Sequence, residues 1–93
     1  MKSIAWSPEK NEQLKSERGV SFEDVVYHMQ AGDILDTFDH PNQERYAHQQ
    51  IHAIAIEEYI YLVPFIETDD EVFLKTIIPS RKATKKYRGE GNE

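Results

Sequence analysis

The stretch EVFLKTIIPSRKATKKYR (residues 71–88) begins as an apolar strand and ends as a basic helix. Val72–Ile78 is expected to be the last strand of a sheet, and Pro79 ends it because proline has no N–H to donate to a strand ladder. Ser80 carries the hydroxyl typical of a helix N-cap. The sequence therefore predicts a short helix over about residues 81–88, directly after the strand.

The charge of the chain is divided between this stretch and the rest. Residues 72–88 carry six basic and no acidic residues, whereas residues 1–71 carry five basic and 15 acidic residues, and the whole chain has a net charge of −6. Like charges placed this densely repel one another, so they favour an anionic partner, and basic clusters are typical of nucleic-acid binding. A solvated basic end that only improves solubility is the alternative interpretation.

Helical spacing gathers the basic side chains. Arg81, Lys85 and Arg88 share one face at i, i+4 and i+7, and Lys82 and Lys86 lie beside them. The N-cap hydroxyl and the free N–H groups of the first turn are expected to add an anion site. The tyrosine near the end of the helix could stack a nucleobase. The residues predicted to bind phosphate or RNA are Ser80, Lys85, Lys86, Tyr87 and Arg88.

Length and composition limit the class of protein. A chain of 93 residues is expected to form one domain, residues 1–93, with residues 89–93 as a disordered tail. The chain has no cysteine, which excludes disulfides and thiol catalysis. It shows no signal peptide and no apolar run of about 18 residues, so we expect a cytoplasmic protein without a membrane span.

The first third of the chain predicts a strand and two helices. Residues 3–6 favour a brief strand. Ser7-Pro8 is a helix start signal, and the helix is expected to run over about residues 8–18 and to end at Gly19. It has one large apolar residue, so it is expected to be mostly solvated or covered by a partner. Ser21–Gly32 holds a second helix, with a capping box at its start and apolar residues at helical spacing.

The middle of the chain changes to the period of strands. Residues 34–39 are expected to be a strand that is followed by a loop over residues 40–44. Residues 47–56 and 59–66 are expected to be two further strands, with Pro64 at a bulge or an edge. These two and the last strand, three strands joined by short turns, predict an antiparallel meander. The expected fold class is α+β: two N-terminal helices packed on an antiparallel β-sheet, followed by a short basic C-terminal helix.

Two residues of the loop before the 47–56 strand could carry chemistry. Arg45 could clamp a phosphate, although an ion pair with a neighbouring carboxylate is equally compatible with the sequence. His40 is the histidine best placed to act as a general base, with an ordinary exposed loop histidine as the alternative. The chain has no cysteine and no HExxH motif, so no metal site and no cofactor are predicted.

Four short motifs resemble the BrnT family of type II toxins, within the wider group of RelE-like ribonuclease toxins. The matching residues are Trp6–Asn11, Arg18–Val25, Glu44–Tyr46 and Ile78–Tyr87. The chain differs from the family at Ser7, where the family usually has Asp, and at Arg18, where it usually has His. The resemblance implies a RelE-like toxin that cleaves RNA without a metal ion. It also implies a cognate antitoxin with a ribbon-helix-helix domain, through which the pair would bind operator DNA.

These observations lead to two hypotheses. In the first, the 2′-hydroxyl of RNA attacks its own phosphate, and Arg45, Arg81 and Lys82 stabilise the developing charge. The proton acceptor would be His40, Glu44 or Tyr87. In the second, the chain is a non-catalytic binding module that acts through an antitoxin complex or through nucleic acid. In either case we expect the antitoxin to cover the basic helix.

Overall fold

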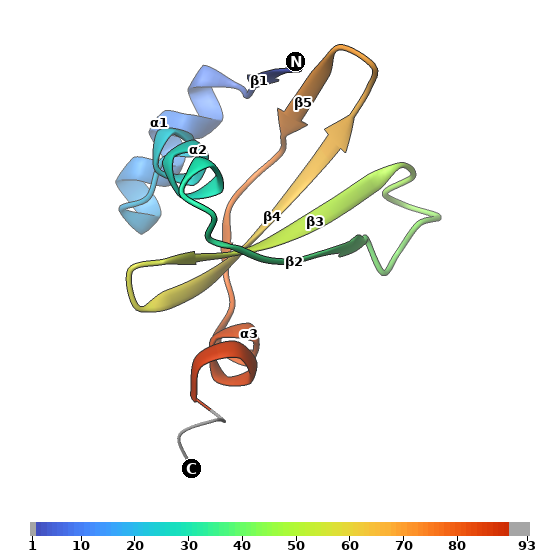
Figure 1. The fold of residues 1–93 in the computed structure, drawn as a ribbon. Helices are drawn as coiled ribbons and strands as arrows, with labels where there is room; N and C mark the ends of the chain where they lie inside the picture. The colour runs from blue at the N-terminus through green and yellow to red at the C-terminus, as the bar shows by residue number, and fades with distance from the viewer. Residues whose placement is uncertain (1, 90–93) are drawn as a thin grey trace.

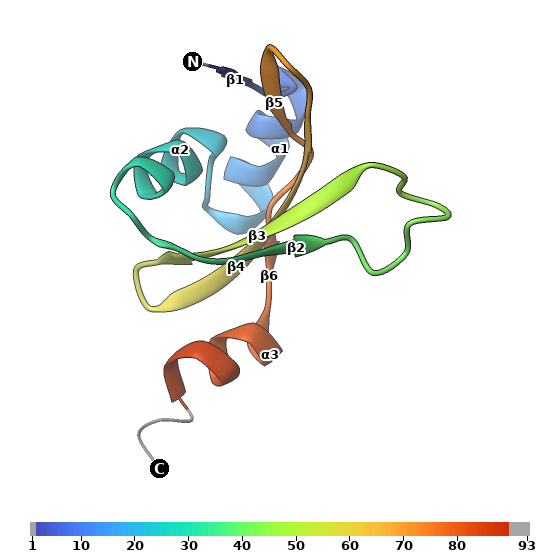
Figure 2. The ribbon, with the colours of Figure 1, turned by 45° about the vertical axis from the view of Figure 1, so that its right-hand side comes forward.

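The computed structural model describes residues 2–89, of which Figures 1 and 2 show the arrangement. These residues form an α+β fold with three helices and a mixed six-stranded sheet. The sheet has the strand order β1-β5-β4-β3-β2, and β6 pairs with β4. The elements along the chain are β1 (Ser3–Ala5), α1 (Pro8–Arg18), α2 (Phe22–Gln30), β2 (Ile34–Asp39), β3 (Gln49–Ile56), β4 (Tyr59–Glu67), β5 (Glu71–Leu74), β6 (Ile78–Pro79), α3 (Arg81–Thr84) and the π-helical turn η1 (Lys85–Gly89).

Local signals placed the two N-terminal helices correctly. The Ser7 hydroxyl accepts a hydrogen bond from the backbone N–H of Lys10, and Gly19 ends α1 in the left-handed region at φ 68°. Ser21 and Asp24 form the reciprocal capping box at the start of α2. Each signal acts within one turn of the chain, so its effect does not depend on the rest of the fold.

The predicted antiparallel meander of β3, β4 and β5 is confirmed, and β2 extends it by pairing antiparallel with β3, but the prediction of a wholly antiparallel sheet is wrong. β1 pairs in parallel with β5, with Ile4 opposite Val72. Parallel neighbours need a long connection. Here the chain between them includes both N-terminal helices and the rest of the meander, so short turns do not dictate the direction of β1.

The predicted last strand is also wrong as a single element, because it is broken into β5 and β6. The break faces Pro64, whose carbonyl accepts a hydrogen bond from Lys75 N at 2.8 Å but whose nitrogen has no hydrogen to donate. Ile77 turns inward and is fully buried, and Arg18 donates to its carbonyl. Pro64 therefore lies inside β4, opposite an irregular part of the ladder where the β5–β6 side has one extra residue. Of the two expected positions for Pro64, a bulge or an edge, the structure shows the first.

The C-terminal helix occupies the expected place with a different geometry. Its first turn is α-helical, and residues 85–89 continue as a π-helical turn. The predicted tail of residues 89–93 lies outside the described residues, apart from Gly89. The strand expected from residue 47 begins at residue 49, after a loop in which His48 has φ 66°.

The core lies between α1, α2 and one face of the sheet (Figure 2). α1 adds little to it, as its composition indicated: Leu14 is its one buried apolar side chain. The main core residues are Leu14, Val20, Phe22, Val25, Ile54, Ile56, Val63, Phe65, Leu74 and Ile77. In the views of Figures 1 and 2, α3 lies on the opposite side of the sheet from α1 and α2.

Among the described residues, no helix combines the length and the apolar composition that crossing a bilayer would require.

Candidate functional site

The start of the basic helix is fixed to β4, next to its pairing with β6, by backbone and hydroxyl hydrogen bonds. Ser80 N donates to Ile60 O at 3.1 Å, and the Ser80 hydroxyl accepts from Ala83 N at 3.0 Å. The Thr84 hydroxyl accepts from Ile60 N at 2.8 Å and donates to Ser80 O at 2.7 Å. Because Ile60 is fully buried in the sheet, these bonds attach both ends of the first helical turn to a rigid strand.

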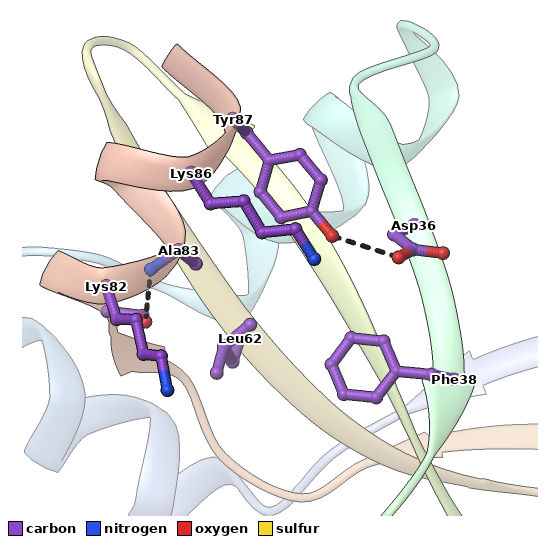
Figure 3. Close-up of a pocket in the computed structure, with 8 residues that line it drawn as sticks. Asp36, Phe38, Leu62, Lys82, Ala83, Lys86 and Tyr87 are labelled. Atoms are coloured by element: carbon purple, nitrogen blue, oxygen red, sulfur yellow. Dashed lines mark hydrogen bonds between the residues drawn. The ribbon is translucent and has the colours of Figure 1, made fainter. Parts of the chain in front are cut away.

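A groove of about 340 Å³ runs between this helix and the outer face of β2 and β4 (Figure 3). Its floor is apolar and includes Phe38 and Leu62, and Phe38 is 37% exposed. The two lysines on its helical wall are four residues apart, so they lie one above the other. The residues that line the groove are Asp36, Phe38, Leu62, Ser80, Lys82, Ala83, Lys86 and Tyr87.

The positive charges of the helix are available to a ligand. Arg81, Lys82, Lys85 and Lys86 are exposed, and no carboxylate within residues 2–87 forms an ion pair with any of them. In an acidic chain this leaves a local excess of positive charge on one wall of the groove. Such an arrangement attracts anions and binds them more weakly at high salt.

One acidic side chain reaches the groove from the opposite wall. Tyr87 Oη donates a hydrogen bond to Asp36 Oδ2 at 2.9 Å, and Thr37 N donates to Asp36 Oδ1 at 2.9 Å. The hydrogen bond to Asp36 raises the pKa of Tyr87 above its ordinary value. Lys86 Nζ lies 5.2 Å from the centre of the Tyr87 ring, so a carboxylate, a phenol and an ammonium group meet at one end of the groove (Figure 3).

Most of the residues predicted from the basic stretch come together here. Ser80, Lys82, Lys86 and Tyr87 line the groove. Arg81 and Lys85 are exposed on the same helical segment, and Arg88 belongs to η1.

The structure does not bring Arg45 and His40 to this groove. Both lie in the loop between β2 and β3, which Figures 1 and 2 show well separated from α3. The guanidinium carbon of Arg45 is 5.6 Å from the centre of the Tyr46 ring, and the centres of the His40 and Tyr46 rings are 4.3 Å apart. Asn42 N donates to His40 Nδ1 at 3.0 Å. These side chains therefore form a separate aromatic cluster at the far end of β2.

Sequence reasoning missed Asp36, Phe38 and Leu62. Asp36 and Phe38 follow Ile34 at intervals of two residues, and Ile34 packs on the core. In a regular strand, residues two apart point to the same face, so Asp36 and Phe38 would be assigned to the core face together with Ile34. The structure has a bulge between Ile34 and Asp36 that reverses this alternation. The sequence carried no signal for the bulge, and Leu62 could not be assigned to a face without the position of the helix above it.

Two further findings bear on the predicted chemistry. Within the described residues, no three histidine, aspartate or glutamate side chains are close enough together to hold a metal ion. Arg18 donates to the carbonyl of Ile77 and so joins α1 to the segment between β5 and β6. In this chain Arg18 therefore has a structural contact.

Comparison of the chain with protein-family models, with curated proteins and with solved structures finds no significant match.

Proposed function

We propose that the groove beside α3 binds single-stranded RNA and that the protein cleaves it without a metal ion. It would act as the RelE-like toxin of a type II toxin–antitoxin pair, the class to which the BrnT-like motifs point. The observation that carries the proposal is that Lys82 and Lys86, with which no carboxylate of residues 2–87 forms an ion pair, stand beside an apolar, partly aromatic floor. RNA offers the complementary chemistry, because each nucleotide joins an anionic phosphate to a flat apolar base.

The size of the groove supports binding of a nucleotide. Ligand pockets in proteins usually start at about 300 Å³, and this groove reaches about 340 Å³. Phe38 offers an exposed aromatic surface on which a base can stack. Lys82 and Lys86, on the helical wall, can each bind one of the two phosphates that flank that base in the RNA chain. Arg81 and Lys85 would attract the phosphates that lie outside the groove.

Cleavage of an oligoribonucleotide tests the proposal. The purified protein, in the presence of EDTA, should convert a 5′-labelled RNA into fragments ending in a 2′,3′-cyclic phosphate and should leave the matching DNA intact. The double variant Lys82→Ala/Lys86→Ala should lose RNA affinity, and its salt slope should fall by about 0.7 for each lost phosphate contact.

The matched control is Lys10→Ala/Lys15→Ala, which removes two charges from α1 on the other side of the sheet. Its RNA affinity and salt slope should stay at the wild-type values. Equal losses in the two double variants would mean that net charge, and not the groove, determines binding.

We also propose that a cognate antitoxin, of the ribbon-helix-helix type, covers the exposed face of the basic helix, with Arg81 and Lys85, together with the groove beside it. Phe38 and Ile78 are 37% and 40% exposed next to the cationic helix. An acidic amphipathic segment would satisfy both the apolar and the charged part of this surface. The double variant Arg81→Ala/Lys85→Ala should bind such a partner more weakly in a pull-down. Unchanged affinity would place the antitoxin elsewhere.

A non-catalytic binding module is the second candidate, and the apolar floor of the groove favours it. Leu62 and Phe38 form an apolar surface that can pack against side chains of a protein segment, whereas a phosphate gains nothing from such a surface. Expression of the chain alone in a host cell separates the two candidates. Toxicity that is lost in the groove variants supports the ribonuclease, whereas harmless accumulation of folded protein supports the binding module.

A further inference from the structure

The bulge in β2 directs an acidic side chain to the groove. Ile34 pairs with Ile54, but Asp36 pairs with Ala53, so β2 contains one residue more than β3 over this interval. Without the extra residue, Asp36 would point to the same face as Ile34, towards the core. Bulges of this kind occur next to active sites, where they redirect a side chain.

An uncompensated carboxylate is unfavourable in a site that only binds phosphate, because it repels the ligand. Asp36 nevertheless faces the groove beside Tyr87 and Lys86, and it accepts hydrogen bonds from Tyr87 Oη and Thr37 N. A carboxylate is useful in such a place if it accepts a proton during the reaction. Tyr87 is less suited to that role, since the hydrogen bond to Asp36 raises the pKa of the phenol and keeps it protonated.

We propose that Asp36 is the general base and Tyr87 the general acid of the reaction, an inference that rests on the proposed cleavage of RNA. Asp36 takes the proton of the 2′-hydroxyl, and the O2′–phosphorus bond forms. Lys86 stabilises the charge that develops on the phosphate oxygens. As the phosphorus–O5′ bond breaks, the departing 5′-oxygen takes the proton of Tyr87.

The two groups then return to their starting states without any other reagent. The products are a 2′,3′-cyclic phosphate and a 5′-hydroxyl, and the protein is left with a protonated Asp36 and a Tyr87 phenolate. Their oxygens are hydrogen-bonding partners at 2.9 Å in the free protein, so the proton passes from Asp36 to Tyr87. The hydrogen bond seen in the structure thus becomes the path that restores the site.

The competing explanation is that the Tyr87–Asp36 bond only holds η1 against β2. Asp36→Asn separates the two explanations, because an amide oxygen still accepts the bond from Tyr87 but cannot take a proton at neutral pH. Asp39→Asn is the matched control: it removes the same charge from the same strand, at a position that pairs with Gln50 and therefore lies on the other face.

The assay measures single-turnover cleavage of a 5′-labelled oligoribonucleotide, and binding of its 2′-O-methyl form, which lacks the attacking hydroxyl. We expect Asp36→Asn to cleave about 100-fold more slowly or worse, with affinity for the 2′-O-methyl RNA unchanged or higher. Asp39→Asn should match the wild type. If Asp36→Asn cleaves within threefold of the wild type, the base assignment is overturned.

Tyr87 has its own test. Tyr87→Phe should cleave ordinary RNA slowly, but should recover on RNA with a 5′-sulfur at the scissile bond, because a thiolate leaves without a proton. An equal loss on both substrates would give Tyr87 a merely structural role and overturn the acid assignment. If the wild-type protein itself cleaves no RNA, the proposed function fails, and this inference fails with it.

Discussion

Replacing Asn11 by alanine should destabilise the protein because the buried backbone N–H of Phe22 loses its hydrogen-bond acceptor. Asn11 lies on α1, is only 4% exposed, and makes two hydrogen bonds to the start of α2. Its Oδ1 accepts from Phe22 N at 2.8 Å, and its Nδ2 donates to Glu23 Oε1 at 2.8 Å. α1 buries one apolar residue, Leu14, so Asn11 provides much of its attachment to the rest of the fold.

The loss of stability in Asn11→Ala depends on which of the two broken hydrogen bonds water can replace. Glu23 is exposed, so its carboxylate regains a partner from solvent. Phe22 is fully buried, and its N–H would be left without an acceptor, at a cost of about 1–3 kcal/mol. Taking about 2 kcal/mol, a domain of this size should unfold roughly 10 °C lower.

Thermal and urea unfolding of matched variants provides the assay. Gln13→Ala, on the exposed side of the same helix, and Glu23→Ala, which leaves the bond to Phe22 intact, should each change the melting temperature only slightly. In Asn11→Ala the pKa of Glu23, which the hydrogen bond from Asn11 holds below 4.5, should rise towards that value in an NMR titration. A loss below about 0.5 kcal/mol in Asn11→Ala, no larger than that of Gln13→Ala, would refute the reasoning.

Three further predictions concern other parts of the fold. In the two-residue turn between β3 and β4, Glu57 has φ 58° and Glu58 does not have a positive φ, so Glu57→Gly should stabilise the protein by about 0.5–1 kcal/mol in urea unfolding, whereas Glu58→Gly should bring no gain. Burial lowers the pKa of His52 below 6.5, despite the opposing effect of Glu67. The contribution of neutral His52 to stability is therefore complete above about pH 6.5 and falls as the pH drops through the lowered pKa. The melting temperature of His52→Gln should therefore decline less than that of the wild type as the pH drops over this range. Melting temperatures that fall in parallel for the two proteins would contradict this. Thr84→Val should remove one of the two attachments of α3 to Ile60 and speed hydrogen exchange at the Ile60 amide, at a cost of about 1–3 kcal/mol, while Thr68→Val should leave that amide protected.

Elements fixed by local chemistry could be predicted from the sequence. Ser7, Gly19 and Ser21 each act within one helical turn, and α1 and the start of α2 lie where those residues indicate. The direction of β1 and the break between β5 and β6 depend on contacts between residues far apart in the chain, such as Arg18 with Ile77 and Lys75 with Pro64. No local pattern encodes such contacts.

The candidate site divides in the same way. The cations of α3 are neighbours in the sequence, and they remain neighbours in the fold. Asp36 could not be predicted as a groove residue, because one added residue in β2 changes which side chains point to each face of the sheet. Arg45 was predicted to act on the same phosphate as Arg81 and Lys82 because an arginine at a loop–strand junction can clamp a phosphate, but its loop follows the far end of β2 (Figure 1).

NMR titration with a 2′-O-methyl oligoribonucleotide, which binds but has no free hydroxyl to react, tests the central claim most directly. If the groove beside α3 is the RNA site, the amide signals of Asp36, Phe38, Leu62 and residues 80–87 should shift together, and those of α1 should stay in place. Shifts centred on the loop of residues 40–48, or on α1, with the groove signals unchanged, would contradict the account.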